Sequence, residues 1–160
     1  MFHAFYKLSK SIVLPIICIL IEISLLNKKG ITCNKKDLCG KWFLFWIGFG
    51  SLSTGLMQSL NPSYTATLLD VSPENFIIIR ELGCANVGMG IIGILSIKLE
   101  SFRKPAAIVV GVFILGAIII HLQRIHNIDF GEAVSLIDDL WIFAVACFTI
   151  LYKPRKTLST

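Results

Sequence analysis

Charged residues are scarce in this chain. Lys, Arg, Asp and Glu make up only 16% of its 160 residues, whereas 55% are hydrophobic, and the mean hydropathy is +0.77. A soluble domain of this length cannot remove so much apolar surface from water. The composition therefore excludes an ordinary soluble protein and predicts a chain that lies in a membrane.

The chain also lacks the short motifs that mark many enzymes. It contains no phosphate-binding loop, no recognisable nucleophile motif, no haem-ligand pair and no C-x-x-C redox pair. The loops between its apolar segments are short and leave little room for a catalytic domain. Neither an enzyme class nor a cofactor is therefore predicted, although a site assembled from distant residues would leave no local motif.

Cysteine and histidine are placed poorly for a metal site. Cys33 and Cys39 stand in a polar loop without a nearby histidine, and we expect both to be free thiols. His121 and His126 would point about 140° apart on a helix, which argues against a shared metal. The remaining cysteines lie in apolar segments, where a thiol acts as a small hydrophobe: Cys18, Cys84 and Cys147.

Apolar stretches are what the chain has in abundance. A bilayer core takes roughly 20 apolar residues per helix, so the sequence predicts an all-α integral membrane bundle that forms one domain over residues 1–160. Four helices are the alternative if the first or the last does not span, because the last is short and brings Asp138 and Asp139 to the membrane edge. The five predicted helices cover approximately residues 11–26, 42–60, 76–99, 106–122 and 136–152.

Basic residues alternate between the two sides of this bundle. The first loop, the third loop and the C-terminal tail are basic, whereas the second and fourth loops are acid-rich. The positive-inside rule then places the C-terminus in the cytoplasm and the N-terminus outside. Lys7 and Lys10 are basic residues on the outer side and do not fit the rule, but they are outnumbered. The net charge of +5 favours contact with a lipid bilayer over nucleic acid. The basic residues counted are Lys28, Lys29, Lys35, Lys36, Lys41, Lys98, Arg103, Lys104, Lys153, Arg155 and Lys156.

Cleavage of the first segment as a signal peptide is the alternative to a first helix. A basic start and an apolar core fit a signal peptide. However, Glu22, Asn27 and Lys28 stand where small residues should mark the cleavage site. The uncleaved helix is therefore the favoured interpretation.

The predicted helix 76–99 carries small residues on more than one of its faces. Gly83, Gly90 and Gly93 share one stripe, and Gly88 lies on another face. Because small residues let helices approach closely in a membrane, we expect this helix to be central. Packing within one chain, in a homo-oligomer or against another membrane protein predicts the same pattern. The glycines assigned to helix packing are Gly83, Gly88, Gly90, Gly93, Gly111 and Gly116.

Strong polar residues gather at the outer helix ends in this topology. Ionisable groups at membrane depth are costly and often mark a ligand or proton path. We expect Glu81, Asn86 and His121 to converge with one of the two aspartates, with Arg80 as a counter-charge. The alternative is structural, since such groups also tie helices together or snorkel to the interface. The predicted cluster is Arg80, Glu81, Asn86, His121, Asp138, Asp139 and Gln58.

One set of residues forms a recognisable pattern: the block from Arg80 to Asn86, Gly90 and Gly93, His121, and Asp138 or Asp139. This pattern resembles a family of small uncharacterised bacterial multi-pass membrane proteins, loosely DoxX-like. The resemblance covers roughly residues 55–151. It implies a helical bundle in the bacterial inner membrane and brings no established activity. The family pattern often has a histidine where Gln58 stands and a Gly-Asn-x-Gly turn at residues 131–134, so these departures weaken a two-histidine site.

Two functional classes follow from these observations. The favoured one is a non-enzymatic membrane protein, either an accessory subunit or a binder of a small molecule whose identity the sequence leaves unknown. The alternative is a small transporter or proton-coupled carrier in which Glu81, His121 and an aspartate would be proton-sensitive. A membrane enzyme ranks third.

The charge pattern predicts the orientation of the chain. A reporter fused to the C-terminus should be active on the cytoplasmic side, because the basic loops and the tail share that side. Reporter activity on the outer side would contradict this orientation. So would labelling of Cys33 and Cys39 by a membrane-impermeant thiol reagent in intact cells.

Overall fold

The computed structural model describes residues 9–31, 34–69 and 71–152, and every regular element in these ranges is a helix. The predicted all-α class is therefore confirmed. In chain order the elements are a π-helical turn η1 (Ser9–Val13), α2 (Leu14–Lys28), α3 (Lys35–Leu60), α4 (Pro62–Leu69), a 3₁₀ turn η2 (Pro73–Asn75), α5 (Phe76–Leu95), η3 (Glu100–Phe102), α6 (Arg103–Gln123), η4 (Ile125–Asn127) and α7 (Phe130–Leu151).

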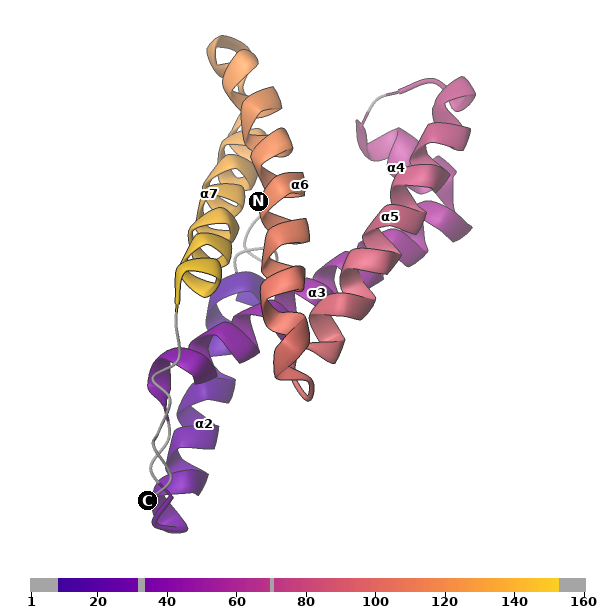
Figure 1. Cartoon of the computed structure of the whole chain (residues 1–160). Coiled ribbons are helices and arrows are strands. Elements are labelled where there is room, and N and C mark those ends of the chain that lie inside the picture. Colours follow the sequence, from indigo (N-terminus) through magenta and orange to yellow (C-terminus); the bar gives the residue numbers. More distant parts are fainter. Residues whose placement is uncertain (1–8, 32–33, 70, 153–160) are drawn as a thin grey trace.

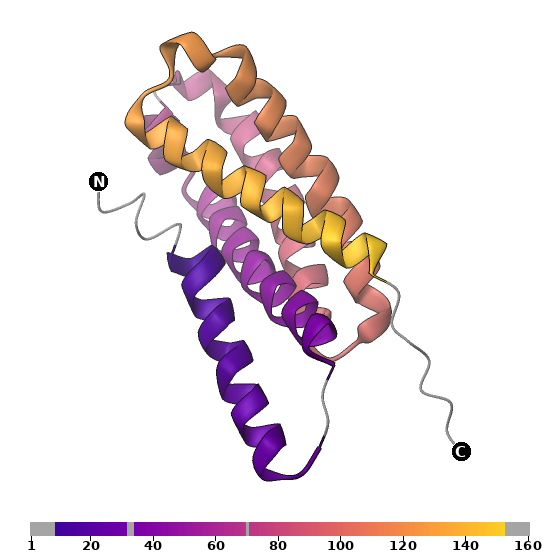
Figure 2. The ribbon, with the colours of Figure 1, turned by 90° about the vertical axis from the view of Figure 1, so that its left-hand side faces the viewer.

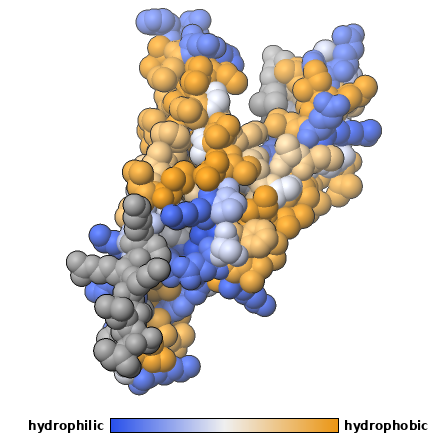
Figure 3. Space-filling view, in the orientation of Figure 1, coloured by the Kyte–Doolittle hydropathy of each residue, from blue (hydrophilic) through white to orange (hydrophobic). Residues whose placement is uncertain are grey.

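Four helical segments of the described chain are long and apolar enough to cross a membrane: Ser11–Lys28, Pro73–Leu95, Glu100–Gln123 and Phe130–Leu151. Hydrophobic residues cover much of the visible surface, and hydrophilic residues gather towards its ends and at the centre (Figure 3). The chain is therefore a membrane protein. The long helix α3 is not among these four, because it is less hydrophobic than a membrane-crossing segment should be. The sequence had instead pointed to the first or the last helix as the one that does not span.

The centre of the bundle is α3. It contacts α2, α4, α5, α6 and α7, whereas the expected centre, α5, has an exposed apolar face that includes Ile77 and Ile78. The prediction of a central helix 76–99 was therefore wrong. A helix surrounded by protein needs less apolar surface than one that faces lipid, which explains how α3 accommodates Ser51, Ser53 and Gln58.

The long helices form two antiparallel pairs, α3 with α5 and α6 with α7. The pairs approach each other at one end and diverge towards the other (Figure 1). The shorter α2 runs beside α3, and the view from the side shows both helices inclined in the same sense (Figure 2). Four buried polar residues line the space between the two pairs: Ser11, Gln58, Asn86 and Asp138.

One end of the bundle carries the start of α3, the start of α6 and the end of α7. Asn34 donates a side-chain hydrogen bond to the Tyr152 hydroxyl, and Arg103 forms an ion pair with Asp37. We call this the basic end. It joins the first loop, the third loop and the end of the last helix, as the alternating charges require. Which side of the membrane it faces stays a prediction.

Local capping moved several predicted boundaries. α7 begins at Phe130 rather than near residue 136 because Asp129 and Glu132 form a capping box, in which the Asp129 carboxylate accepts from the Glu132 amide at 2.8 Å. α3 begins seven residues early because the Asn34 side chain accepts from the Lys36 amide. The short α4 was not predicted, and α5 ends at Leu95 rather than at residue 99.

The thiol of Cys39 is a poor target for testing the orientation. It lies near the start of α3, before the predicted span 42–60, and burial raises the pKa of the thiol. Since the thiolate is the reactive form, alkylation at neutral pH will be slow from either side. Cys33 lies outside the described residues. Exposed Ser101 and Asn127, which lie at opposite ends of α6, are better positions for introduced cysteines.

Glycines bring the backbones of α3 and α5 into contact. A Cβ at Gly90 would lie 2.6 Å from the backbone nitrogen of Leu52, and one at Gly93 would lie 2.7 Å from Cα of Gly48. Such distances leave no room for any side chain. Gly83 makes the same kind of contact, with the Ser59 backbone nitrogen 2.8 Å from its hypothetical Cβ.

The other predicted packing glycines behave differently. A Cβ at Gly111 would make an ordinary 3.5 Å contact with Ala146, and one at Gly88 or Gly116 would meet no described atom within 4 Å. Gly88 and Gly116 therefore make no packing contact within the described chain, and packing of these two glycines between chains stays a prediction. Glycine content alone does not indicate which side of a helix has a neighbour.

Substitution of the contact glycines should separate α3 from α5. We expect Gly90→Leu and Gly93→Leu to destabilise the protein by at least about 1–3 kcal/mol, the usual cost of overpacking. Unfolding in graded denaturing detergent measures this effect. Gly88→Leu and Gly116→Leu are matched controls that should behave like the parent. Equal stability of all four variants would show that the contact is not needed.

Candidate functional site

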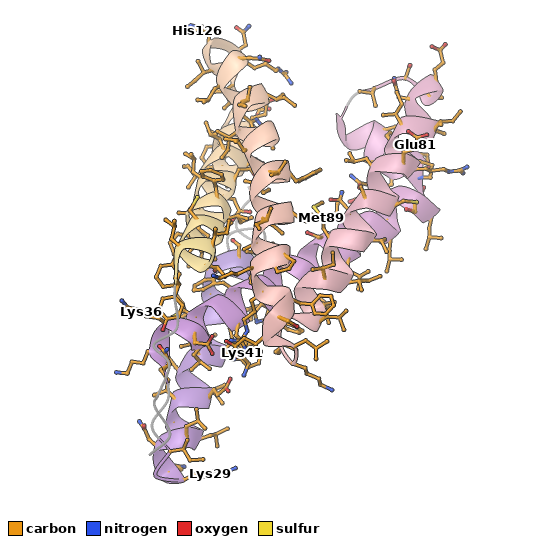
Figure 4. All side chains as sticks on the ribbon, viewed as in Figure 1. Lys29, Lys36, Lys41, Glu81, Met89 and His126 are labelled. Carbon is orange, nitrogen blue, oxygen red and sulfur yellow. The ribbon has the colours of Figure 1, made fainter. Side chains whose placement is uncertain are left out.

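A cavity of about 380 Å³ lies between the two helix pairs. Its size falls within the usual range of ligand pockets, about 300–1,000 Å³. Met89 lines the cavity and projects from α5 towards α6 (Figure 4). Most of the cavity wall is apolar. Residues of η1, α3, α5, α6 and α7 line it, among them Ser11, Ser51, Gln58, Asn86, Met89 and Asp138.

An amide pair from α3 and α5 forms one polar part of the wall. The Asn86 side chain donates a 2.7 Å hydrogen bond to Oε1 of Gln58, and both residues are buried. Asn86 lies on the helical face of Gly83 and Gly90, so the close glycine contact brings its amide to α3. Two predicted residues, Gln58 and Asn86, therefore meet at the cavity.

A buried carboxylate from α7 forms the second polar part. The Ser11 hydroxyl of η1 donates to Oδ1 of Asp138, and the Trp141 indole N–H donates to the Ser11 carbonyl oxygen at 3.3 Å. Only 9% of Asp138 is exposed. The structure thus brings Asp138 to the same cavity as Gln58 and Asn86. Ser11 was not predicted, because a single serine in an apolar segment carries no signal.

The other aspartate makes a separate contact. Nε2 of His121 on α6 lies 3.6 Å from Oδ2 of Asp139 on α7, and neither residue lines the cavity in the described chain. Arg124 and Glu132 form a second ion pair between the same ends of these helices, at 3.1 Å. This geometry fits the structural alternative stated above, in which His121 ties two helices together.

Arg80 and Glu81 do not join the cluster. Both are exposed on α5, and within the described residues neither forms an ion pair. Glu81 lies on the α3–α5 arm, apart from the α6–α7 arm (Figure 4). The predicted convergence of Glu81 with His121 is therefore wrong. Placing two helix ends at one level of the membrane does not determine which sides of those helices face each other.

Sequence reasoning also missed an ion pair outside the cavity. Nζ of Lys41 on α3 lies 2.7 Å from Oε1 of Glu22 on α2, and the Trp42 indole N–H donates to Oε2 at 2.6 Å. The pair is partly buried and holds α2 against α3. The two charges are 19 residues apart on separate helices, so no spacing rule would have linked them.

The family model of DUF6790, a family of unknown function, matches residues 8–158. The chain belongs to DUF6790. The match spans the described helices and every cavity residue named above, and it confirms the predicted membership of an uncharacterised family. No curated protein and no solved structure matches the chain. The loose likeness to DoxX-like proteins stays an expectation from the sequence.

The polar wall of this DUF6790 cavity offers hydrogen bonds and one carboxylate. Amide groups of Gln58 and Asn86 both donate and accept, the Asp138 carboxylate accepts, and the nearby Ser51 hydroxyl does both. In the described part of the chain no three His, Cys, Asp or Glu side chains come together as a metal site would require. The arrangement is suited to hold a small molecule through a few polar contacts.

The amide pair should show measurable coupling. In a double-mutant cycle with Gln58→Ala and Asn86→Ala, we expect a coupling free energy of about 0.6 kcal/mol and at most about 1.7 kcal/mol, the range for hydrogen bonds between membrane helices. Detergent unfolding of the four proteins measures it. A cycle of Gln58→Ala with Gln123→Ala, at the exposed end of α6, is the control and should be additive. Additive behaviour in both cycles would count against the bond.

Proposed function

We propose that this DUF6790 protein is a non-enzymatic membrane protein that binds a small amphipathic molecule in the cavity between the α3–α5 and α6–α7 pairs. The observation that carries the proposal is the cavity itself, about 380 Å³ in volume, with Gln58, Asn86 and Asp138 in a mostly apolar wall. Ligand sites typically combine an apolar lining with a few well-placed polar groups.

The cost of the polar groups supports a binding role. Burial of a carboxylate at membrane depth is expensive, and such groups commonly serve a ligand or an ion path. Asp138 has the Ser11 hydroxyl as one hydrogen-bond partner. The hydrogen bond between Asn86 and Gln58 uses only part of the hydrogen-bonding capacity of the two side-chain amides. A ligand with a polar group at one end and an apolar body would match this wall.

The proposal includes an orientation. We place the cavity in the outer half of the cytoplasmic membrane, with the N-terminus outside and the C-terminus inside, because the basic end lies away from the diverging arms. α3 would then be a fifth crossing helix. Its antiparallel contacts with α5, from Gly48 with Gly93 to Ser59 with Gly83, support this placement.

A proton-coupled carrier is the second candidate. The observation that favours it is the contact between His121 and Asp139, because histidine is the side chain that most readily changes charge near neutral pH. A carrier would use this pair for protons and the cavity for its substrate. The proposed binder needs only the cavity.

Filling the cavity should weaken binding. A photoreactive fatty alcohol in lipid nanodiscs should label residues of the cavity in a saturable manner, as mapped by mass spectrometry. We expect Met89→Trp to weaken the saturable labelling about tenfold or more, since overpacking costs at least about 1–3 kcal/mol. Met57→Trp is the matched control, because Met57 lies on α3 with 45% of its surface exposed and does not line the cavity.

The outcomes separate the two candidates. Labelling that does not saturate, or that responds equally to both tryptophan variants, would contradict the binding proposal. Proton flux into vesicles containing the parent protein, abolished in His121→Asn while detergent stability is kept, would establish the carrier instead. Lost stability in His121→Asn without any flux in the parent would leave His121 as a tie between α6 and α7.

A further inference from the structure

A second cavity, also about 380 Å³, opens at the basic end and shares no lining residue with the first. The start of α3, the start of α6 and the end of α7 form its walls. Lys36, in the first turn of α3, marks this region on the ribbon (Figure 4). Its lining side chains include Lys36, Ser101, Arg103, Lys104, Phe148 and Tyr152.

One paired and two exposed positive charges meet in this cavity. The Arg103 guanidinium donates to Asp37 and, through Nε, to the Ser96 carbonyl oxygen at 3.2 Å, so its position is set and the Asp37 charge is offset. Lys36 and Lys104 are exposed and form no ion pair with another described residue. The acid that remains at the rim is Glu100, which leaves an excess of positive charge.

Neutral donors add to this charge. Hydroxyls of Ser101 and Tyr152 line the same cavity. Arg103 and Lys104 are also the first residues of α6, a helix of 21 residues without a side-chain cap at its start. The positive end of its dipole therefore reinforces attraction for an anion. Lysines, hydroxyls and a helix start together are the groups that proteins use to bind phosphate.

The cavity continues into an apolar surface. The ring of Phe148 stacks on Tyr152, with centroids 6.0 Å apart and planes 14° apart. Phe148 is 40% exposed, and the neighbouring Leu151 is 78% exposed. Both belong to the membrane-spanning segment Phe130–Leu151. A phosphate held by the lysines would therefore have a lipid-facing surface beside it.

We propose that the cavity at the basic end binds the phosphate of an anionic phospholipid, with Lys36 and Lys104 at the headgroup and the Phe148–Tyr152 stack against the acyl chains. A soluble phosphate ester shares the headgroup chemistry but would leave the aromatic stack unused. A bound lipid would join the ends of α3, α6 and α7. This site is independent of the ligand proposed for the first cavity.

Native mass spectrometry of the full-length protein tests the site. The purified protein in mild detergent is titrated with phosphatidylglycerol or phosphatidylcholine. We expect one preferred phosphatidylglycerol adduct, and an apparent affinity about thirtyfold weaker in the double variant Lys36→Ala/Lys104→Ala. The matched control is Lys35→Ala/Lys98→Ala, which removes the same charge from the same end of the bundle but not from the cavity and should keep the adduct.

Several results would overturn the site. Equal loss of adduct in both double variants would indicate diffuse attraction to the basic end. Both lipids carry a phosphate and only phosphatidylglycerol has a net negative charge, so equal binding of the two would contradict a site for an anionic phospholipid. Displacement of phosphatidylglycerol by equimolar glycerol 3-phosphate would assign the cavity to a soluble phosphate ester. Circular dichroism checks the fold of each variant, and the exposed single change Lys104→Gln repeats the test if the double variant is unfolded.

Discussion

The close contact between α3 and α5 is the interaction on which the rest of the structure depends. Gly48 and Gly93 meet with almost no space between their backbones, and Gly90 lies against Leu52. In a membrane, apolar side chains gain little by leaving lipid for protein, so close backbone packing and interhelical hydrogen bonds must hold helices together. The glycine contact supplies the packing and brings Asn86 to Gln58. It thereby builds one wall of the central cavity.

Lipid imposes a second constraint, because a polar group within it needs a partner. Buried side-chain nitrogen and oxygen atoms in the described chain all have one. The partners come mainly from other helices: Glu22 with Lys41 joins α2 to α3, and Ser11 with Asp138 joins η1 to α7. Thus the bonds that satisfy polar groups also fix the peripheral helices. Their structural and functional roles are not mutually exclusive.

Composition and hydropathy were sufficient to predict an all-α membrane bundle, because a bilayer accepts few other solutions. They could not identify the central helix. Periodicity shows that Gly83 and Gly90 share a face, but it does not say what that face meets, and Gly88 lies on a face without a neighbour. The same limit explains why Glu81 was wrongly grouped with His121. Residues at one depth approach each other only when their helices are adjacent and rotated towards each other.

The bundle combines a rigid part with a more adaptable one. Packing within each antiparallel pair is more extensive than packing between the pairs, most of all in α3–α5. In that pair the glycine backbones lie in direct contact. Small relative movements of the pairs therefore cost less than any change within α3–α5. Because the central cavity lies between the pairs, its shape depends on packing that is less extensive than the packing within them. A cavity so placed can adjust to an occupant while its amide pair keeps its geometry.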